Sequence, residues 1–171
     1  MMSKKMQAAL NEQIKHELES AYLYYAMVAY LSDQGLDGMA QWMKVQTQEE
    51  LAHAAKLFDF IVERNGRVEL EALKKPQKEW DSPLSVFKDA YQHEQFITSK
   101  INDLYKLAQE ENDYPAAVLL QWFINEQVEE EAAALKVVED LERVGGTGHG
   151  IFMLDRELGA RTFTPPTAEG E

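Results

Sequence analysis

The sequence predicts an all-α protein: a four-helix bundle with one long crossover and a short fifth helix near the C-terminus. Apolar residues recur with the helical period over four segments, each far longer than the roughly 11–12 residues of an average globular helix. Two connections between these segments are short, and the middle one is long. We therefore expect a single domain, residues 1–171, with bundle helices at about 4–32, 38–64, 83–111 and 115–144, a short helix at about 151–158 and a tail at 159–171.

The ends of the expected helices carry residues that commonly start or stop a helix. The third and fourth segments open at "DSP" and "NDYP", where Pro83 and Pro115 suit the first helical positions. Gly35 suits the end of the first segment, Asn65-Gly66 the end of the second and Gly145-Gly146 the end of the fourth. The tail "TFTPPTAEGE" cannot be helical across its two adjacent prolines.

The lengths of the connections predict how the helices are arranged. Short links join the first segment to the second and the third to the fourth, so each pair should form an antiparallel hairpin. Residues 67–82 join the two hairpins and, when extended, could span roughly 50 Å. A helix of about 27 residues is only about 40 Å long, so this link can run the whole length of the bundle. The chain would then restart at the far end, as in bundles with one long crossover.

The charge balance and the absence of cysteine restrict what the protein can bind. Thirty acidic residues against 17 basic ones give a net charge of −13, which disfavours nucleic acid and favours cations as partners. Without cysteine there can be no thiolate metal site, iron–sulfur cluster, disulfide or cysteine nucleophile. No apolar run approaches the roughly 18 residues of a membrane span, and no signal-peptide core is visible. We expect a cytoplasmic protein that binds neither nucleic acid nor membranes.

Each of the four long segments carries a glutamate in the middle of its apolar stripe: Glu17, Glu50, Glu94 and Glu130. His53 follows Glu50 by nearly one helical turn and leaves the same face. All four glutamates lie near mid-helix, so antiparallel packing should bring them to one level of the bundle. One such glutamate, or one Glu-x-x-His pair, is usually a solvated or rim feature. Four at matching depth indicate a site.

Four buried carboxylates need a source of positive charge. An ionised carboxylate without a partner is expensive to bury, and several in one place also repel one another. No matching set of Lys or Arg occupies these stripes, so either the stripes face outward or a cation fills the centre. A pair of divalent metal ions resolves the conflict, with Glu50 as the natural bridging ligand. Carboxylates with one imidazole suit Fe(II), Mn(II) or Zn(II), whereas Ca²⁺ prefers loops rich in carbonyl oxygens.

At these residues the sequence resembles the prokaryotic non-haem ferritins, over nearly its whole length. The matching motifs are "LNEQIKHELESAYLYYAM", "QEELAHAAKLFDF", "YQHEQFITSKINDL", "DYPAAVLLQWFINEQVEEEA" and the final "LDREL". The resemblance implies a ferritin-like four-helix bundle that assembles as a hollow 24-subunit shell and stores oxidised iron as a mineral. It also implies a ferroxidase, an enzyme that oxidises Fe(II) with dioxygen at a di-iron centre inside each subunit.

The resemblance also assigns roles to individual residues. Three ligands would hold the first iron: Glu17, Glu50 and His53. The second iron would share Glu50 and add two more ligands, Glu94 and Glu130, with Gln127 close by. Tyr24 would lie beside the centre. A third, weaker iron site toward the interior of the shell would use Glu49, Glu126 and Glu129, with Glu130 shared.

Departures from related families narrow the assignment. Bacterioferritins and rubrerythrins carry Glu-x-x-His on both the second and the fourth helix, whereas the fourth helix here reads Gln127-x-x-Glu130. Bacterioferritins also place a haem-binding methionine directly after the second-helix glutamate, where this chain has Leu51. We therefore expect an asymmetric di-iron centre and no haem.

The sequence as a whole favours an iron-storage ferroxidase. Two alternatives stay open at this point. One is a di-iron oxygenase or peroxidase that acts on a small molecule, which would need a substrate pocket beside the metals. The other is a non-catalytic helical metal carrier with a structural site only. Particle size would distinguish the iron-storage ferroxidase from both alternatives. The ferroxidase should form a shell, whereas either alternative would be a monomer or a small oligomer.

Overall fold

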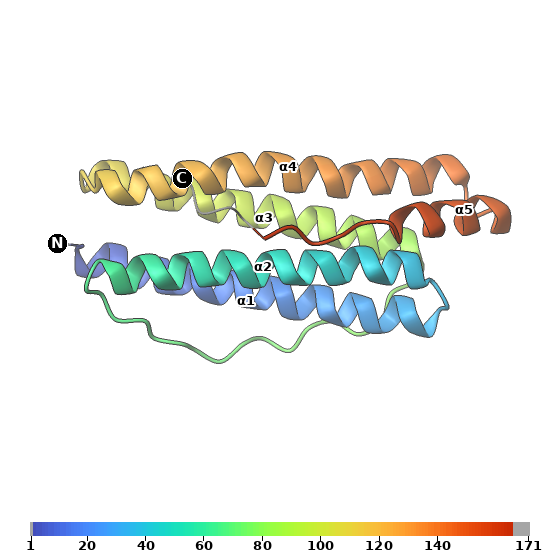
Figure 1. Ribbon diagram of the computed structural model, residues 1–171, viewed down its shortest axis with the longest axis horizontal. Helices are drawn as coiled ribbons and strands as arrows, with labels where there is room; N and C mark the ends of the chain where they lie inside the picture. Colours follow the sequence, from blue (N-terminus) through green and yellow to red (C-terminus); the bar gives the residue numbers. More distant parts are fainter. Residues whose placement is uncertain (1, 166–171) are drawn as a thin grey trace.

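The computed structural model describes residues 2–165, and it confirms the all-α fold with four long helices and a short fifth one (Figure 1). The helices are α1 (Lys4–Asp33), α2 (Asp37–Glu63), α3 (Pro83–Glu110), α4 (Tyr114–Val144) and α5 (Gly148–Leu158). The last residues of the predicted tail, 166–171, lie outside the described part of the chain. None of the described helices combines the length and the hydrophobicity that a membrane span requires.

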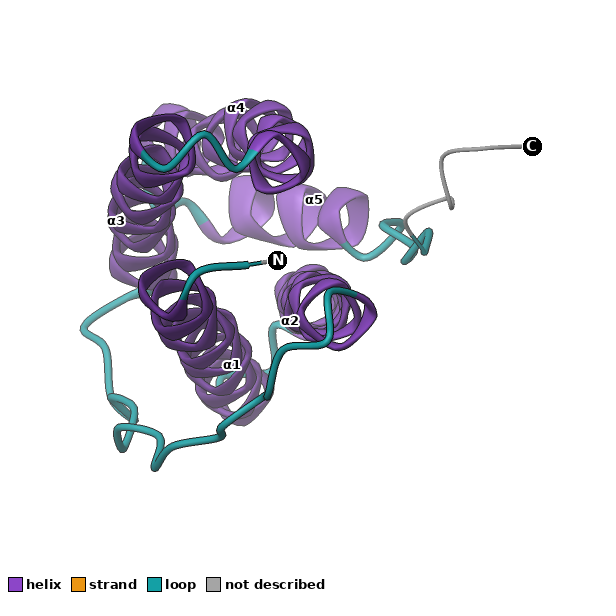
Figure 2. Ribbon diagram, turned by 90° about the vertical axis from the view of Figure 1, so that its left-hand side faces the viewer, coloured by secondary structure: helices purple, strands orange, loops and turns teal. Residues whose placement is uncertain are grey.

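Two helical hairpins make up the bundle. α1 packs against α2 and α3 packs against α4, while α1 and α3 form the closest contact between the two hairpins. Figure 2, which looks along the helices, shows this arrangement, with α2 and α4 farther apart on the other side. α5 lies at one end of the bundle, where it packs on α2 and α4.

The chain between α2 and α3 runs alongside α1 from one end of the bundle to the other (Figure 1). Polar contacts hold it there at successive turns of α1. Asn11 Nδ2 donates to the Arg67 carbonyl at 3.0 Å, and Lys15 Nζ bonds Glu71 at 3.1 Å. Farther along, the Lys74 amide donates to Glu19 at 3.0 Å. The long connection therefore reaches the far end of the bundle, as its length predicts.

The helices begin and end at residues suited to those positions. Ser82 caps α3 in a reciprocal capping box with Ser85, and Asp113 caps α4 by accepting from the Ala116 amide at 3.1 Å. Gly145 ends α4 in the left-handed conformation, with φ 60°. One expected boundary differs, because α5 begins at Gly148 rather than at Ile151. The low helix propensity of glycine hides this first turn from a reading of the sequence.

Two apolar cores fill the two ends of the bundle. The core near α5 includes Tyr24, Met27, Leu31, Met39, Met43, Phe87, Val137, Leu141 and Leu154. The core at the opposite end includes Met6, Leu10, Ile14, Leu57, Ile61, Ile97, Ile101, Leu120 and Phe123. Between them lies a layer of buried polar side chains, which we call the polar layer: Gln13, Glu17, Ser20, Gln46, Glu50, His53, Glu94, Gln127 and Glu130.

Candidate metal centre

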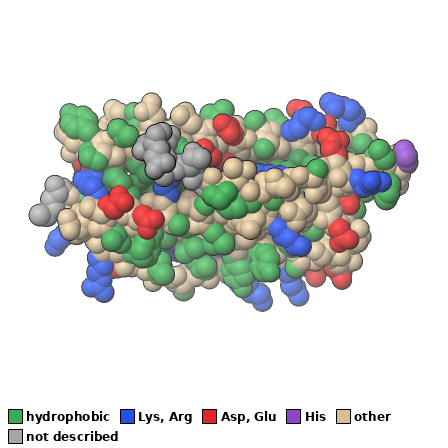
Figure 3. Space-filling model, in the orientation of Figure 1, with side chains coloured by type: hydrophobic (Ala, Val, Ile, Leu, Met, Phe, Trp, Pro, Cys, Tyr) green, Lys and Arg blue, Asp and Glu red, His purple; other side chains and the backbone are tan. Residues whose placement is uncertain are grey.

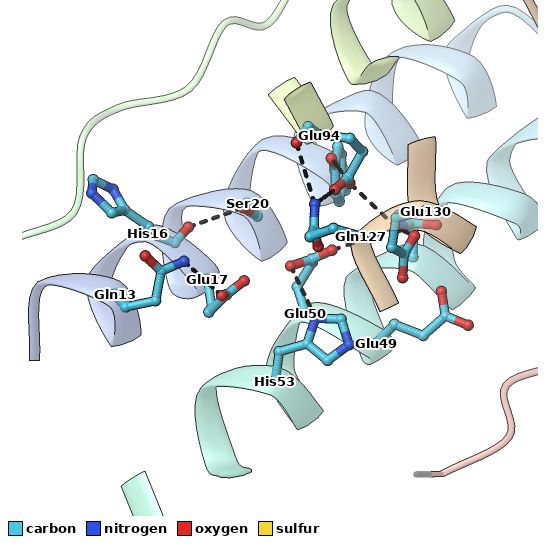
Figure 4. Close-up of polar contacts among 12 residues, drawn as sticks. Gln13, His16, Glu17, Ser20, Glu49, Glu50, His53, Glu94, Gln127 and Glu130 are labelled. Atoms are coloured by element: carbon cyan, nitrogen blue, oxygen red, sulfur yellow. Dashed lines mark hydrogen bonds and ion pairs between the residues drawn. The ribbon is translucent and has the colours of Figure 1, made fainter. Parts of the chain in front are cut away.

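Each long helix contributes one glutamate to the polar layer, and α2 also contributes a histidine (Figure 4). The five side chains are almost fully buried: the exposed fractions are 0 % for Glu17, 1 % for Glu50, 2 % for His53, 2 % for Glu94 and 7 % for Glu130. They are buried because each lies on the apolar stripe that its helix turns toward the interior. The layer therefore concentrates acidic groups where water does not solvate them.

The ligand atoms of these five side chains form two overlapping groups. Glu17, Glu50 and His53 form one group, and their ligand atoms all lie within 4.8 Å of one another. The second group, with the same limit on its distances, contains Glu50, Glu94 and Glu130. Glu50 belongs to both groups, and its Oε2 lies 3.7 Å from His53 Nδ1. Two three-ligand groups that could each hold a metal ion, and that share one carboxylate, thus lie within a single bundle.

Amide and hydroxyl groups orient the carboxylates. Gln13 Nε2 donates to Glu17 Oε1 at 2.8 Å, and Gln127 Nε2 donates to Glu94 Oε2 at 3.2 Å. The Tyr24 hydroxyl also donates to Glu94. Glu17 Oε2 is buried and has no hydrogen-bond partner among the described residues. A buried carboxylate oxygen without a donor is costly to leave unpaired, and it is available to a cation.

Burial shifts the acid–base behaviour of the layer. Loss of hydration, together with the nearby Glu50 carboxylate, raises the pKa of Glu17 to about 8. Burial likewise raises the pKa of Glu130 to about 8 and that of Glu94 to about 7, although the donors Tyr24 and Gln127 oppose the shift at Glu94. The pKa of Glu50 is also raised, by burial and by Glu94 and Glu130. Without a cation, the layer holds protons near neutral pH.

The residues of the layer fit a pair of hard divalent cations. Carboxylate oxygens predominate and a single imidazole completes the set, a combination that suits Fe(II), Mn(II) or Zn(II). In the described part of the chain, none of the four carboxylates forms an ion pair with Lys or Arg. Bound cations would supply the positive charge that makes burial of the ionised carboxylates favourable.

Comparison with known proteins identifies the family. The Ferritin family, described as a ferritin-like domain, matches residues 7–144. The chain belongs to the ferritin family. A "Bacterial non-heme ferritin" from Bacteroides fragilis is 38 % identical over 161 residues, which are 94 % of this chain and 100 % of the relative. A second one, from Staphylococcus aureus, is 36 % identical over 163 residues, covering 95 % and 98 %.

Solved ferritin structures agree with the fold. A closed form of the Archaeoglobus fulgidus ferritin, engineered by site-directed mutagenesis, superposes with a TM-score of 0.95 at 49 % identity. The match covers 96 % of this chain and all of that one. The open-pore ferritin from the same archaeon superposes with a TM-score of 0.94 at 48 % identity, covering 95 % of this chain. The bundle described above is thus a ferritin bundle along almost its whole length.

The residues expected at a third site in this ferritin chain lie in different surroundings. Glu126 forms a group with His53 and Glu130 in which the ligand atoms lie within 4.8 Å of one another. Glu49 is half-buried near this group, but its carboxylate is paired with Arg161 at 2.6 Å. Glu129 is exposed and belongs to none of the three groups found among the described residues. A third cation would therefore meet His53, which the resemblance did not place there.

Gln127 contacts the centre through its amide nitrogen. Besides Glu94 Oε2, its Nε2 also donates to the Glu94 carbonyl at 3.2 Å and to Thr98 Oγ1 at 3.3 Å. In this orientation Gln127 holds Glu94 in place, and only a flip of the amide would offer an oxygen to a metal. The ligand role expected for Gln127 thus stays a prediction.

Sequence reasoning missed three side chains that shape the centre: Gln13, Gln46 and Arg161. A signal existed for the two glutamines, since each precedes a core glutamate, Glu17 or Glu50, by one helical turn on the same face. Arg161 left no such signal, because it follows α5 in a segment without periodicity. Its contact with α2 becomes visible only in three dimensions.

Two further histidines adjoin core glutamates, since His16 precedes Glu17 and His93 precedes Glu94. Because His16 and His93 each adjoin a core glutamate, their rotation on the helix predicts surface positions. The structure instead places both partly inside the α1–α3 contact, where His93 Nε2 lies 2.7 Å from Ser20 Oγ and His16 packs edge-on against Phe96. Both histidines are partly exposed, and their flanks are partly covered because α1 and α3 approach each other closely.

Proposed function

We propose that this chain is an iron-storage ferroxidase: it binds two Fe(II) ions inside each bundle, oxidises them with dioxygen and passes the ferric product to the interior of a shell. One observation carries this proposal. Two buried three-ligand groups share the Glu50 carboxylate, and no internal Lys or Arg pairs with them among the described residues. The ferritin relatives support the same reading.

In this proposal the two groups hold the substrate ions. Glu17, Glu50 and His53 would bind one Fe(II), and Glu50, Glu94 and Glu130 would bind the other. The Glu50 carboxylate would contribute a ligand to both ions and so keep them close together. Tyr24 acts as a positioning residue through its hydrogen bond to Glu94. Sites built on four packed helices keep such a geometry better than sites on loops.

The charge of the centre favours oxidation. Anionic oxygen ligands stabilise Fe(III) more than Fe(II), since the interaction grows with the charge of the ion and the surroundings are poorly hydrated. Each Fe(II) gives one electron, and dioxygen accepts both. When Fe(II) binds, the carboxyls whose pKa is raised to about 7 or 8 must release their protons near neutral pH. Binding should thus be tighter at higher pH.

Assembly into a 24-subunit shell is part of the proposal. Large hydrophobic side chains are exposed along α1 and α2, among them Tyr22, Tyr25, Leu51, Phe58 and Val62. Figure 3 shows hydrophobic side chains gathered over this part of the surface. A contiguous exposed apolar surface is typical of protein–protein contacts.

The cytoplasmic location and the absence of haem stay predictions.

Particle size and iron chemistry together test the function. In gel filtration, the shell should elute near 24 times the 19.6 kDa mass of one chain. Fe(II) added in air should give a fast rise in ferric absorbance and a soluble mineral. A small particle that consumes dioxygen only with an organic substrate would indicate the oxygenase alternative. A small particle that binds metal without oxidising it would indicate the carrier.

Substitution of the shared ligand tests the assigned centre. Glu50→Ala removes a ligand from both sites, so we expect the initial oxidation rate to fall by at least roughly 100-fold, as for loss of key groups at metal sites. Glu63→Ala, at an exposed position of the same helix, is the matched control and should retain the wild-type rate. An unchanged rate in Glu50→Ala would show that oxidation takes place elsewhere.

A further inference from the structure

The segment that follows α5 returns to the middle of the bundle (Figure 1). The end of α5 is held against the start of α2. The Asp155 carboxylate of α5 accepts from the Met39 amide at 2.8 Å and from the Gly38 amide at 3.2 Å. Beyond α5, Gln41 Nε2 donates to the Arg161 carbonyl at 3.4 Å. These contacts bring the Arg161 side chain onto α2, level with the polar layer.

The Arg161 guanidinium contacts three residues of α2. Nη2 donates to Glu49 Oε2 at 2.6 Å, and Nη1 donates to Gln46 Oε1 at 2.8 Å. The guanidinium carbon lies 4.2 Å from the centre of the Trp42 ring, a cation–π distance. Both side chains of the Arg161–Glu49 pair are only 22 % exposed. This pair is therefore better shielded from water than an ordinary surface salt bridge.

Gln46 links this guanidinium to the metal centre. Its carbonyl oxygen accepts from Arg161, which directs its amide nitrogen toward the carboxylates. That nitrogen donates to Glu130 and also lies 3.4 Å from Glu50 and 3.5 Å from Glu94. One buried amide thus joins Arg161 to three of the four core glutamates.

We propose that Arg161 is a resident cation that occupies the position of a third metal ion at Glu49, and that an ion binding there must displace it. This inference rests on the proposed function, because it concerns how the iron sites are regulated. Glu126, His53 and Glu130 already converge beside Glu49, whose carboxylate Arg161 holds (Figure 4 shows Glu49 beside the centre). Release of Arg161 would free Glu49 to join them.

The competition has a direct physical basis. A guanidinium and a divalent ion cannot both neutralise the same carboxylate oxygen, so each weakens the binding of the other. With Arg161 in place, Glu49 is neutralised and a third ion gains little. The segment after α5 therefore acts as a gate: it keeps the third site weak, and a bound third ion loosens the segment from α2.

Zn²⁺ titration of the assembled, metal-free protein tests this gate without any oxidation step. Calorimetry of the wild type should show two tight ions per subunit and a weaker third one. In Arg161→Gln the competing charge is gone, and we expect the third ion to bind about tenfold more tightly, in the range of typical coupling between sites. The two tight ions should change much less.

Arg156→Gln is the matched control. Arg156 is exposed on α5, its guanidinium lies over the Phe152 ring at 6.0 Å, and its removal changes the net charge by the same amount. Equal affinity for the third ion in the two variants would overturn the proposal. Adding Glu49→Gln to Arg161→Gln should abolish the gain, because Arg161 acts through Glu49. A wild type that binds no tight Zn²⁺ would instead contradict the proposed function.

A spectroscopic signal separates displacement of Arg161 from a general change in charge. In a Trp122→Phe background, which removes the indole 5.6 Å from His53, the third Zn²⁺ should alter the emission of Trp42 as Arg161 leaves its ring. The same step should be silent when Arg161→Gln is added. A change that is complete after two ions would contradict the gate. If Arg161→Gln fails to assemble, Arg161→Lys serves, because lysine keeps the charge but lacks the planar fork that bonds Glu49 and Gln46 through separate nitrogens. A smaller gain in affinity for the third ion is then expected, and the absence of any gain would overturn the proposal.

Discussion

The two apolar cores and the polar layer between them share the same four helices but have opposite energetics. The cores bury leucine, methionine and aromatic side chains, which stabilises the fold whether or not a metal is bound. The layer buries four carboxylates, and their raised pKa values show that the folded protein disfavours their charged forms. Stability and metal binding are thus assigned to different levels along the bundle axis.

The separation of the cores from the polar layer explains how the bundle stays folded although it buries four carboxylates. The layer is unfavourable for folding in its charged form, and the cores on both sides offset that penalty. A bound cation removes the penalty. The folded protein therefore gains stability when the cation binds, and the cores supply the stability that keeps the metal-free site folded. The comparison predicts that substitutions in the cores and in the layer respond differently to metal.

The largest expected change in stability comes from the cores. Leu10→Ala removes a fully buried side chain from the core opposite α5, and we expect the free energy of unfolding to fall by about 3 kcal/mol. Leu31→Ala does the same in the core near α5. Chemical denaturation with and without Zn²⁺ should give the same loss. A loss that shrinks strongly when metal is present would show that the cores and the layer are not independent.

Within the layer, the next largest effect should distinguish the two metal groups. Of the two groups that share Glu50, Glu130→Ala removes a ligand from the second only, so we expect about 100-fold weaker binding of that ion, close to 2.7 kcal/mol, with the ion of the first group nearly unchanged. His53→Ala should weaken the other ion instead. Titration calorimetry measures both. Equal loss at both sites in either variant would count against this division of the ligands.

Most of the fold was predictable from the sequence because its signals are local. Helical periodicity defines the long helices, and the lengths of the connections leave few ways to join them. Glu50 and its counterparts were predictable for a related reason, since a carboxylate on an apolar stripe conflicts with its surroundings. The sequence pattern and the energetics of burial point to the same residues.

The rest of the site depends on contacts that periodicity does not encode. The spacing of Gln46 places it on the face of Glu50, but its hydrogen bond to Glu130 on α4 and its link to Arg161 depend on how the helices pack. The position of Arg161 follows from the docking of α5 through Asp155, which has no signature in the sequence. The partly buried histidines His16 and His93 depend on how closely α1 approaches α3.

The smallest expected effect is a pH dependence confined to the layer. In the folded, metal-free protein the pKa of Glu17 is about 8, against 4.5 for an ordinary glutamate, so the folded state keeps a proton that the unfolded state releases. The stability that this proton provides is fully present below about pH 4.5 and is lost as the pH rises through 8. Glu94 and Glu130 act in the same direction.

We therefore expect the melting temperature of the metal-free protein to fall by about 5 °C between mildly acidic and mildly alkaline pH, which corresponds to about 2 kcal/mol for a chain of this length. Glu17→Gln should flatten this slope, because glutamine keeps the shape and cannot ionise. Scanning calorimetry across the pH range measures both proteins in the same assembly state. With Zn²⁺ bound, the melting temperature of the wild type should no longer fall as the pH rises, since the ions replace the protons. A metal-free slope that is identical in wild type and Glu17→Gln would mean that Glu17 is already ionised and neutralised within the fold, and the polar layer would then need no metal to be stable.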